Sequence, residues 1–322
     1  MSNFDIKKFL KLTNGFNFNI KDIELIKGGL GLSKRKYFRI KNESSKSYIL
    51  MDCSLESQTL KNFIKIQNKL QAHKFSVPEI FILHEEMSCA ILEDFGEKHI
   101  KDLIQENRSN IRYIEVIYKK LIDLIIELQK LPSEDLLIKQ NFKNPELFIK
   151  YYLPFLKGSV VNLEEKIEYS KIWEEIMQNI FKISESFVIS DYHSENIMCL
   201  LQRKYSQTFG LLDFQDAFLG CISIDLMSLL QDVRINVSED LVNKMINYFV
   251  EKKNLDLEKF LVNYHIFGAR HQLDILGKFY KFSLDHPQID IQEYLKLSMK
   301  YLKINLQHPV LNSLKIFLSR YL

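Results

Sequence analysis

The sequence is poor in the features that mark disulfide-rich, membrane-spanning and linker-rich proteins. Its 4 cysteines are isolated and never form a C-x-x-C pair, so we expect buried thiols and not zinc or disulfide partners. No run approaches the ~18 apolar residues of a membrane-spanning helix, and residues 1–13 carry charges where a signal peptide has its apolar core. Internal repeats, low-complexity tracts and long Pro/Gly linkers are absent as well. We therefore expect a cytoplasmic globular protein with no membrane partner.

A strong excess of one charge is also missing. The 44 Lys and Arg residues are nearly balanced by 41 Asp and Glu, which gives a formal net charge of +3, and the basic residues are dispersed among acidic ones. This pattern predicts no nucleic-acid partner. With 322 residues, 46% of them hydrophobic, the chain is long enough for two lobes that each have a core. Composition leaves the oligomeric state open.

The type of secondary structure changes along the chain. Short apolar runs at residues 23–26, 35–40, 47–53 and 89–92 predict strands, and residues 55–72 form an amphipathic helical stretch among them. From residue 98 onward helical periodicity predominates, with candidate helices at residues 111–131, 145–156, 163–181, 223–232, 238–251, 257–282 and 291–306. We therefore predict an α+β fold with a small strand-rich N-lobe over residues 1–95 and a larger, mainly helical C-lobe over residues 96–322.

A short strand-rich segment interrupts the helical part and carries three polar residues. Asp191 follows the apolar run 187–189 where the chain leaves the core, and Asn196 lies five residues further on. Apolar runs at 197–201 and 209–212 predict a hairpin that returns Asp213 to the level of Asn196. Amide and carboxylate oxygens held side by side suit Mg²⁺, which keeps waters and nucleotide phosphates as its other ligands.

Phosphoryl transfer from ATP needs a carboxylate that orients the attacking hydroxyl and accepts its proton, together with oxygen ligands for magnesium. The spacing therefore predicts a kinase-type site with Asp191 as the base and with Asn196 and Asp213 as metal ligands. Asp and Asn also populate turns by bonding their own backbone, but the coupling of this loop to a second strand ending in Asp favours the catalytic interpretation. Asp216 is the alternative metal ligand, and Asp213 is preferred because it directly follows the apolar strand.

Two neighbouring residues have more than one interpretation. His193 either contacts substrate or metal, or braces the turn, and bracing is favoured because the roles of a loop histidine are set by its hydrogen bonds. Asp225 begins a predicted helix, where unpaired amides favour a carboxylate even without any function. We expect Asp225 to anchor the catalytic loop.

The first two predicted strands flank a glycine-rich turn at residues 28–31. Its Gly29 and Gly31 can bring backbone N–H groups over phosphates, although glycines in hairpin turns also have a purely geometric cause. The alternation of a strand places Arg35 and Arg39 on one face. The strand at 47–53 lacks the lysine that protein kinases use for the α- and β-phosphates. Arg35 and Arg39 are therefore the candidate phosphate-binding cations, with a solvated basic face as the alternative.

Residues 93–96 contain a D-F-G triplet that lies well before the catalytic loop. In kinases this triplet has to follow the loop. We instead interpret the segment as the hinge between the lobes, where backbone groups from Glu93 to Phe95 meet the adenine edge of ATP.

Together these motifs resemble the aminoglycoside/choline kinase-like phosphotransferases, whose catalytic loop H-x-D-x-x-x-x-N precedes a strand ending in I-D-F or I-D-W. The resemblance is closest to the bacterial anomeric kinases for N-acetylmuramate and N-acetylglucosamine of cell-wall recycling. It rests mainly on the runs 210–220 and 224–232, and the segments 33–39, 48–52, 92–96, 270–271, 275–277 and 308–309 follow in the expected order. The resemblance implies a protein-kinase-like two-lobed fold and an ATP- and Mg²⁺-dependent transfer to an amino sugar.

The sequence departs from the family pattern just before the catalytic base. Ile189 and Ser190 replace the family's His and Arg, and because that His braces the loop in kinase folds, we expect a looser site. Arg270 and His271 match the family and either line the acceptor site or form a polar pair between helices. Two alternatives stay open: a kinase of another acceptor, such as choline or an aminoglycoside, and a nucleotide-binding pseudokinase. The presence of the base and of both metal ligands argues against the second.

Overall fold

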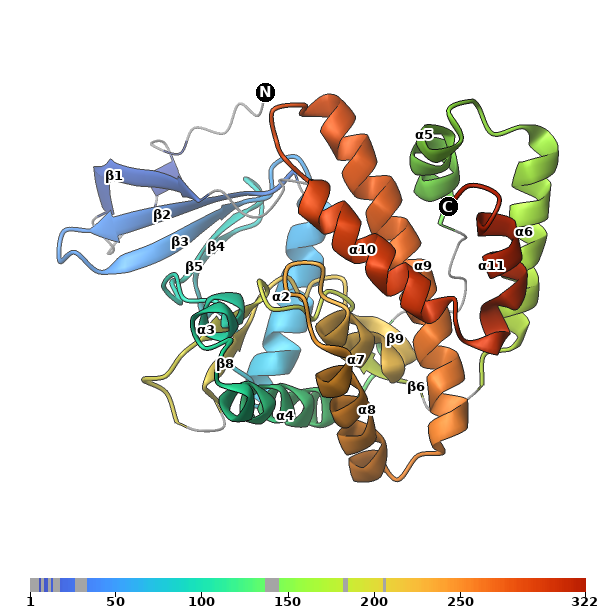
Figure 1. The fold of residues 1–322 in the computed structure, drawn as a ribbon. Helices are drawn as coiled ribbons and strands as arrows, with labels where there is room; N and C mark the ends of the chain where they lie inside the picture. Colours follow the sequence, from blue (N-terminus) through green and yellow to red (C-terminus); the bar gives the residue numbers. More distant parts are fainter. Residues whose placement is uncertain are drawn as a thin grey trace. The chain divides into compact units, whose positions relative to one another are not determined.

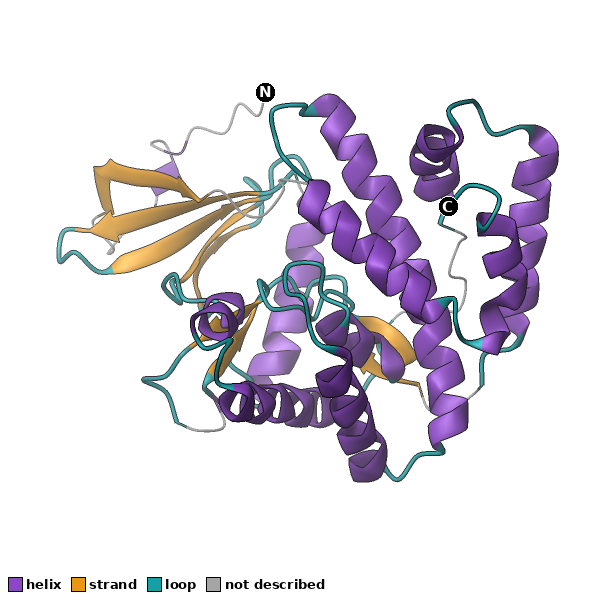
Figure 2. Ribbon diagram, viewed as in Figure 1, coloured by secondary structure: helices purple, strands orange, loops and turns teal. Residues whose placement is uncertain are grey.

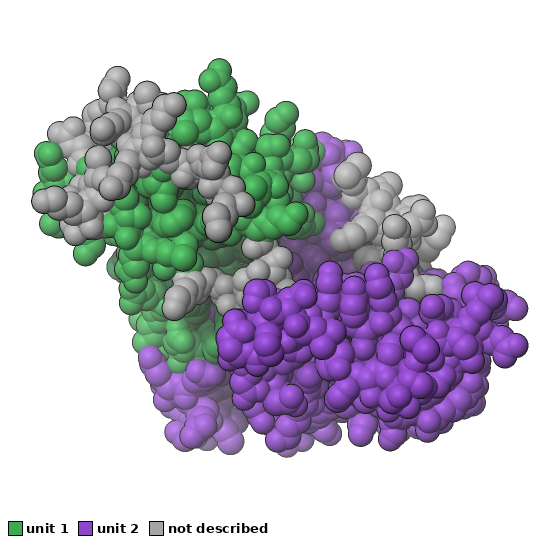
Figure 3. All heavy atoms as spheres, turned by 90° about the horizontal axis from the view of Figure 1, so that it is seen from above, with its two compact units in different colours: residues 1–103, 195–216 green, residues 104–194, 217–322 purple. Residues whose placement is uncertain are grey.

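The computed structural model describes residues 6, 9–10, 13, 18–26, 34–136, 145–181, 185–204 and 207–322, apart from the side chains of residues 19–22. The chain divides into two compact units, coloured separately in Figure 3. Unit 1 comprises Met1–Leu103 and Glu195–Asp216, and unit 2 comprises Ile104–Ser194 and Ala217–Leu322. The glycine-rich turn lies outside the described residues, so the roles of Gly29 and Gly31 stay predictions.

Unit 1 contains, within its described residues, a five-stranded antiparallel sheet (Figures 1 and 2). The order is β1-β2-β3-β5-β4, with β1 (Phe18–Ile26), β2 (Lys36–Asn42), β3 (Ser47–Asp52), β4 (Ile80–His84) and β5 (Cys89–Glu93). The four strands predicted from apolar runs are confirmed. The inward-facing side chains of Ile40, Leu50 and Ile91 are completely buried and form one core with Phe9.

One helix, α2 (Ser57–Ala72), also belongs to unit 1 and confirms the predicted amphipathic stretch. Its buried residues Leu60, Phe63, Ile66, Gln67 and Leu70 recur at helical spacing. The ring of Phe63 stacks on Phe214 with centroids 5.0 Å apart, so α2 packs on the residue that follows Asp213.

The predicted hairpin is formed by β7 (Ile197–Cys199) and β8 (Phe209–Leu211), which pair antiparallel in unit 1. β8 contains Gly210, where a Cβ atom would lie 2.6 Å from Cε2 of Phe95. The missing side chain lets the hairpin approach the ring of Phe95, two residues beyond β5, this closely.

Unit 2 is mainly helical, and the remaining predicted helices are confirmed with small changes of length, except that the one predicted at 145–156 begins as a π-helical turn. After α3 (Ile100–Glu106), its helices are α4 (Ile111–Leu128), the π-helical turn Phe148–Tyr152 continued by α5 (Leu153–Lys157), α6 (Leu163–Gln178), α7 (Ser223–Leu230), α8 (Glu239–Lys253), α9 (Leu257–Asp285), α10 (Gln292–Asn305) and α11 (Asn312–Leu318). The strands β6 (Glu185–Val188) and β9 (Phe218–Cys221) pair antiparallel in the same unit.

The long helix α9 organises unit 2, where it packs along α10 and against α7 (Figure 1). Its Gly277 lies so close to the π-helical turn that a Cβ atom would be 2.3 Å from the backbone at Leu147 and Phe148. Capping side chains begin several of these helices, as Asn162 does for α6 and Asp256 for α9. Among the helices of the described residues, none has both the length and the hydropathy needed to cross a bilayer.

The 4 cysteines are free thiols, three of them buried and Cys221 half-buried. Burial raises the pKa of Cys53 to about 11 and that of Cys89 to about 12, so both thiols are protonated at neutral pH.

Candidate active site

The hairpin of unit 1 brings the two predicted metal ligands to the same end. Ile197 pairs with Leu211, and the N–H of Leu212 donates to the carbonyl oxygen of Asn196 at 2.9 Å. Asn196 therefore stands opposite Leu212, and Asp213 is the next residue. One amide oxygen and one carboxylate make a donor set that fits Mg²⁺, which takes few protein ligands and completes its shell with water and phosphate. In the described ranges there is no cluster of three or more His, Cys, Asp or Glu side chains of the kind other metals use.

Asp213 is held in a well-defined local environment. Its backbone has a φ of 56°, an uncommon left-handed conformation for a residue other than glycine. Its Oδ1 accepts hydrogen bonds from Nη2 of Arg35 at 2.7 Å and from Nε2 of Gln215 at 2.9 Å. Nε2 of Gln215 also donates to Oδ2 of Asp216 at 3.2 Å, so the two candidate metal ligands share this amide.

Arg35 is thereby placed beside a predicted metal ligand, as a phosphate-binding cation would be. Its side chain is only 8% exposed, and Nη1 donates to the hydroxyl of Tyr37 at 3.2 Å. Burial by itself would lower the pKa of Arg35, but the neighbouring Tyr37 and the Asp213 carboxylate outweigh it and hold the pKa above its usual value. The guanidinium is therefore a permanent positive charge at this position.

Arg39 lies on the same strand but has different partners. Its Nε donates to Oδ2 of Asp94 at 2.7 Å, and Nη1 donates to Oε1 of Glu97 at 2.5 Å. The Asp94 carboxylate also accepts from the hydroxyl of Ser47. Burial would raise the pKa of Asp94, but these hydrogen bonds hold it below its usual range. Arg39 thus fixes the predicted hinge segment, and its role toward phosphates stays a prediction.

The other two hinge residues, Glu93 and Phe95, are both bound by an arginine that sequence reasoning missed. Nη2 of Arg203 forms an ion pair with Oε1 of Glu93, and its guanidinium lies 4.9 Å from the centroid of the Phe95 ring. Arg203 belongs to the turn of the β7–β8 hairpin. The hairpin with Asn196 and Asp213 is therefore joined to the predicted adenine-binding segment within one unit.

In unit 2, the residues just before Asp191 are fixed through their backbone. Oδ2 of Asp225 accepts from the N–H of Ile189 at 3.0 Å, and Oδ1 accepts from the N–H of Ser190 at 2.9 Å. The predicted anchoring role of Asp225 is thus confirmed. Because the donors are backbone groups, the bracing does not depend on which side chains stand at positions 189 and 190.

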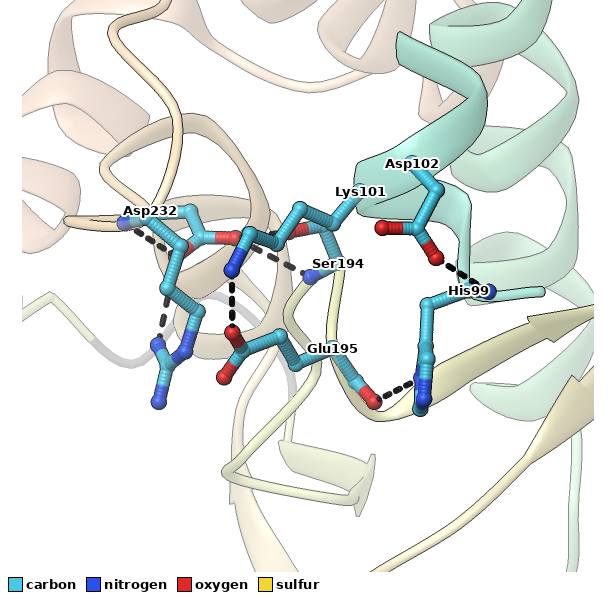
Figure 4. A network of polar contacts seen from close by, with 7 residues as sticks. His99, Lys101, Asp102, Ser194, Glu195 and Asp232 are labelled. Atoms are coloured by element: carbon cyan, nitrogen blue, oxygen red, sulfur yellow. Dashed lines mark hydrogen bonds and ion pairs between the residues drawn. The ribbon is translucent and has the colours of Figure 1, made fainter. Parts of the chain in front are cut away.

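A second carboxylate fixes the residues just after Asp191, and sequence reasoning had not identified it. Oδ2 of Asp232 accepts from the backbone N–H of Ser194 at 3.0 Å and from its hydroxyl at 2.5 Å (Figure 4). The hydroxyl of Tyr192 donates to the carbonyl of Leu121 at 2.9 Å, and the N–H of His193 donates to the carbonyl of Asp191 at 3.0 Å. The loop that carries the predicted base is therefore held on both sides.

The next residue, Glu195, belongs to unit 1 and is fixed there. Its carboxylate pairs with Nζ of Lys101 at 2.6 Å, and its carbonyl accepts from Nδ1 of His99 at 2.7 Å (Figure 4). The backbone N–H of His99 donates to Oδ2 of Asp102 at 2.9 Å. Within this loop, Ser194 is thus fixed by a residue of unit 2, and the next residue, Glu195, is fixed by residues of unit 1.

Arg270 and His271 lie on α9 in unit 2. Nη1 of Arg270 is 3.4 Å from Oδ2 of Asp274, one helical turn further on. Burial lowers the pKa of His271 to about 3, assisted by the positive charges of Lys278, Arg234 and Arg270 and opposed by Asp232. His271 is therefore neutral at physiological pH.

Fold and site together define a phosphotransferase with a protein-kinase-like architecture. A strand-rich unit carries the hairpin with Asn196 and Asp213, and a mainly helical unit carries the loop with Asp191. Residues 23–253 match the model of the phosphotransferase enzyme family, known as APH, and the chain belongs to this family.

Relatives of known function and solved structures are similar over most of the chain. The N-acetylmuramate/N-acetylglucosamine kinase of Caulobacter vibrioides is 25% identical over 273 residues, which cover 80% of this chain and 74% of the relative. The kinase of the same name from Pseudomonas aeruginosa is 24% identical over 269 residues, covering 80% and 76%. The ADP-bound aminoglycoside phosphotransferase APH(2'')-Ib superposes with a TM-score of 0.62 at 15% identity, covering 93% of this chain and 97% of that chain, which shows a shared fold.

Proposed function

We propose that this phosphotransferase transfers the γ-phosphoryl group of ATP to the anomeric hydroxyl of N-acetylmuramate or N-acetylglucosamine. The proposal of the acceptor is supported by the names of the curated relatives, which cover most of the chain. The observation that supports the proposed reaction is the backbone hydrogen bond between Asn196 and Leu212, because it brings Asn196 and Asp213 to the same end of the hairpin.

In this mechanism Asp191 orients the sugar hydroxyl and accepts its proton as the oxygen attacks the γ-phosphorus, the bond from that phosphorus to the bridging oxygen breaks, and ADP leaves. Asn196 and Asp213 are the residues that would hold Mg²⁺. The ion, when bound, neutralises charge on the β- and γ-phosphates. Asp225 and Asp232 act through the loop, because they fix the backbone on both sides of the base. Electrostatic stabilisation by groups that need not move is the largest contribution in such reactions.

We propose Arg35 as the cation that takes the place of the lysine missing from β3. It contacts Asp213 at 2.7 Å, so a phosphate that approaches the metal ligands also approaches the guanidinium. The planar fork of arginine can bind two phosphate oxygens at once. We further propose that Glu93 and Phe95 present backbone groups to the adenine and that Gly29 and Gly31 cover the phosphates. A kinase that consumes ATP is expected to act in the cytoplasm.

The test is to incubate the purified protein with ATP, Mg²⁺ and each sugar, and to follow the products by ³¹P NMR. We expect a sugar 1-phosphate with the wild type and a loss of at least about 100-fold in rate with Asp191→Asn, the size of a general-base contribution. Choline and an aminoglycoside serve as competing acceptors. Phosphorylation of one of these in place of the sugars would contradict the amino-sugar proposal but not the kinase mechanism. ATP binding without turnover on any acceptor would instead indicate a regulatory protein.

A further inference from the structure

The side chain of Arg203 joins three segments of unit 1 that are distant from it in the sequence. Nη2 forms the ion pair with Glu93, Nη1 donates to Oγ of Ser76 at 3.3 Å, and the guanidinium lies 4.9 Å from the centroid of the Phe95 ring. The side chains of Arg203 and Glu93 are 25% and 28% exposed, so water screens their ion pair less than one on the open surface. The mechanism described above assigns no role to these contacts.

The strands of the β7–β8 hairpin are bound to the same part of unit 1 through their backbone. The N–H of Leu211 in β8 donates to the carbonyl of Ser76 at 2.8 Å, and the N–H of Cys199 in β7 donates to the carbonyl of Lys98 at 2.8 Å. Lys98 lies three residues after Phe95. The arginine in the turn therefore adds side-chain contacts to a hairpin whose backbone already runs beside the predicted hinge segment, Glu93 to Phe95.

The two ends of this hairpin carry different groups. Its turn carries Arg203, and its open end carries the predicted metal ligands Asn196 and Asp213. Three residue pairs separate the two ends, Ile197–Cys199 opposite Phe209–Leu211, which corresponds to about 10 Å of antiparallel strand. Because hydrogen bonds between the strands hold this length, the hairpin sets the distance from the hinge segment to the metal ligands as long as its turn stays attached to the hinge.

A nucleotide triphosphate makes this distance important, because its base and its phosphates lie at opposite ends of one molecule. In the proposed function the hinge segment meets the adenine, and the metal held by Asn196 and Asp213 meets the β- and γ-phosphates. Both ends of the nucleotide bind at once only when the two sites are the right distance apart. A site that is already held in that arrangement does not have to be ordered when the ligand arrives, which increases the affinity.

We propose that Arg203 is a positioning residue for the nucleotide, which fixes the hinge segment at a set distance from the metal-binding end of the hairpin. This inference rests on the proposed function and adds a residue to its nucleotide site. Arg203 acts through Glu93 and Phe95 and does not need to touch the nucleotide. Its loss therefore weakens the binding of a ligand that has both base and phosphates, and it leaves the binding of phosphates alone unchanged.

The first measurement is isothermal titration of the wild type, Arg203→Gln and Arg203→Lys with a non-hydrolysable ATP analogue and Mg²⁺. We expect Arg203→Gln to bind the analogue about 10-fold more weakly, the size of a lost hydrogen bond between charged groups. Arg203→Lys keeps a charge for Glu93 but not the flat guanidinium over Phe95, so its affinity should fall in between. Lys204→Gln is the matched control, because it removes the same charge from the exposed next residue of the turn, and it should bind as the wild type does.

Inorganic tripolyphosphate with Mg²⁺ separates positioning from a general structural effect, because it has the phosphates but no base. We expect the wild type and Arg203→Gln to bind it equally, as measured by ³¹P line broadening, whereas Asp213→Asn should weaken it. In steady-state kinetics Arg203→Gln should raise the KM for ATP about 10-fold and keep kcat within about 2-fold, since the groups at the reacting phosphate are unchanged. A variant with a distorted site would instead lose affinity for both ligands and lose kcat as well.

The double variant Arg203→Gln/Glu93→Gln tests the route through Glu93. If Arg203 acts by holding this carboxylate, the losses of affinity in the two single variants do not add in the double variant. Equal affinity of the wild type and Arg203→Gln for the ATP analogue would overturn the inference and leave the proposed function intact, and so would an equal loss for the analogue and for tripolyphosphate. If the wild type itself does not bind the ATP analogue, the proposed use of ATP is wrong, and the inference falls with it.

Discussion

At the scale of single residues, two buried carboxylates brace the loop that carries the predicted base. Asp225 and Asp232 are each only 1–2% exposed, and both accept backbone N–H groups of the loop. A carboxylate that receives two such bonds fixes the chain direction whatever side chains the donors carry. The unusual Ile189 and Ser190 are therefore compatible with an ordered loop, and the looser site that their presence predicted is not a necessary consequence.

Asp225 makes the stability of the protein depend on pH. Burial, together with the charge of Asp191, raises the pKa of Asp225 from 3.8 to about 7, although two backbone N–H groups lower it. The folded state thus favours the protonated carboxyl, so the free energy of unfolding falls as the pH rises from about 4 through 7. Asp225→Asn cannot titrate. Between pH 5 and 8 we expect the variant to gain about 2–3 kcal/mol relative to the wild type.

Urea denaturation of both proteins at pH 5, 6, 7 and 8 measures this effect. In the difference between the two unfolding free energies, the contributions of all other titrating groups cancel. The variant Asp240→Asn, at an exposed position, controls for the loss of one carboxylate. A difference between Asp225→Asn and the wild type that stays constant over this pH range would show that Asp225 is ionised throughout.

The candidate site residues were only partly predictable because their partners lie far away in the sequence. Asp191, Asn196 and Asp213 stand next to apolar runs, so the pattern alone indicates them. Arg203 could not be found in this way, because it acts on Glu93, which is 110 residues distant. Asp232 and Ser194 are 38 residues apart, and no local periodicity connects them. Such contacts follow from tertiary packing.

At the scale of elements, the strands and long helices followed the apolar periodicity, and the omissions have physical reasons. β4 (Ile80–His84) is an edge strand whose exposed and half-buried residues show no clean alternation, and its pairing with β5 defines it. α3 (Ile100–Glu106) and α11 (Asn312–Leu318) are too short to show helical periodicity above chance. The predicted helix at 145–156 instead begins as the π-helical turn, where the chain lies against Gly277 of α9.

Two glycines at contacts between elements should respond differently to replacement by alanine. In Gly277→Ala the new Cβ would meet backbone atoms of Leu147 and Phe148 at 2.3 Å, whereas in Gly210→Ala it would meet the ring of Phe95, which can move. Helix propensity by itself favours alanine at position 277 by about 1 kcal/mol. We nevertheless expect Gly277→Ala to destabilise by more than about 2 kcal/mol and Gly210→Ala by about 1 kcal/mol.

Thermal unfolding of the two variants provides the comparison. The double variant Gly210→Ala/Phe95→Leu should recover part of the loss of the single variant, because the smaller side chain makes room for the methyl group. A Gly277→Ala protein as stable as the wild type would mean that the π-helical turn shifts freely, contrary to the contact described.

At the scale of the whole molecule, the residues of the proposed reaction are divided between two compact units. Unit 1 holds Arg35, Asn196 and Asp213, and unit 2 holds Asp191. The family match over residues 23–253 extends across both units. Nucleotide and metal are thus proposed to bind mainly to residues of one unit, and the acceptor to residues of the other.

This division predicts how a metal–nucleotide complex stabilises the protein. A ligand that binds only the folded state adds about 2.7 kcal/mol at 100 times its dissociation constant, which corresponds to a melting temperature a few degrees higher. We expect ATP with Mg²⁺ to raise the melting temperature more than ATP with EDTA does. Asp213→Asn should remove this Mg²⁺-dependent increment because it deletes a charged metal ligand.

Asp216→Asn is the matched control and should retain the increment. Asp216 shares the Gln215 amide with Asp213, but it stands three residues further along the chain. An increment that survives in Asp213→Asn and disappears in Asp216→Asn would transfer the ligand role to Asp216, whereas one that survives in both would place the metal away from the hairpin.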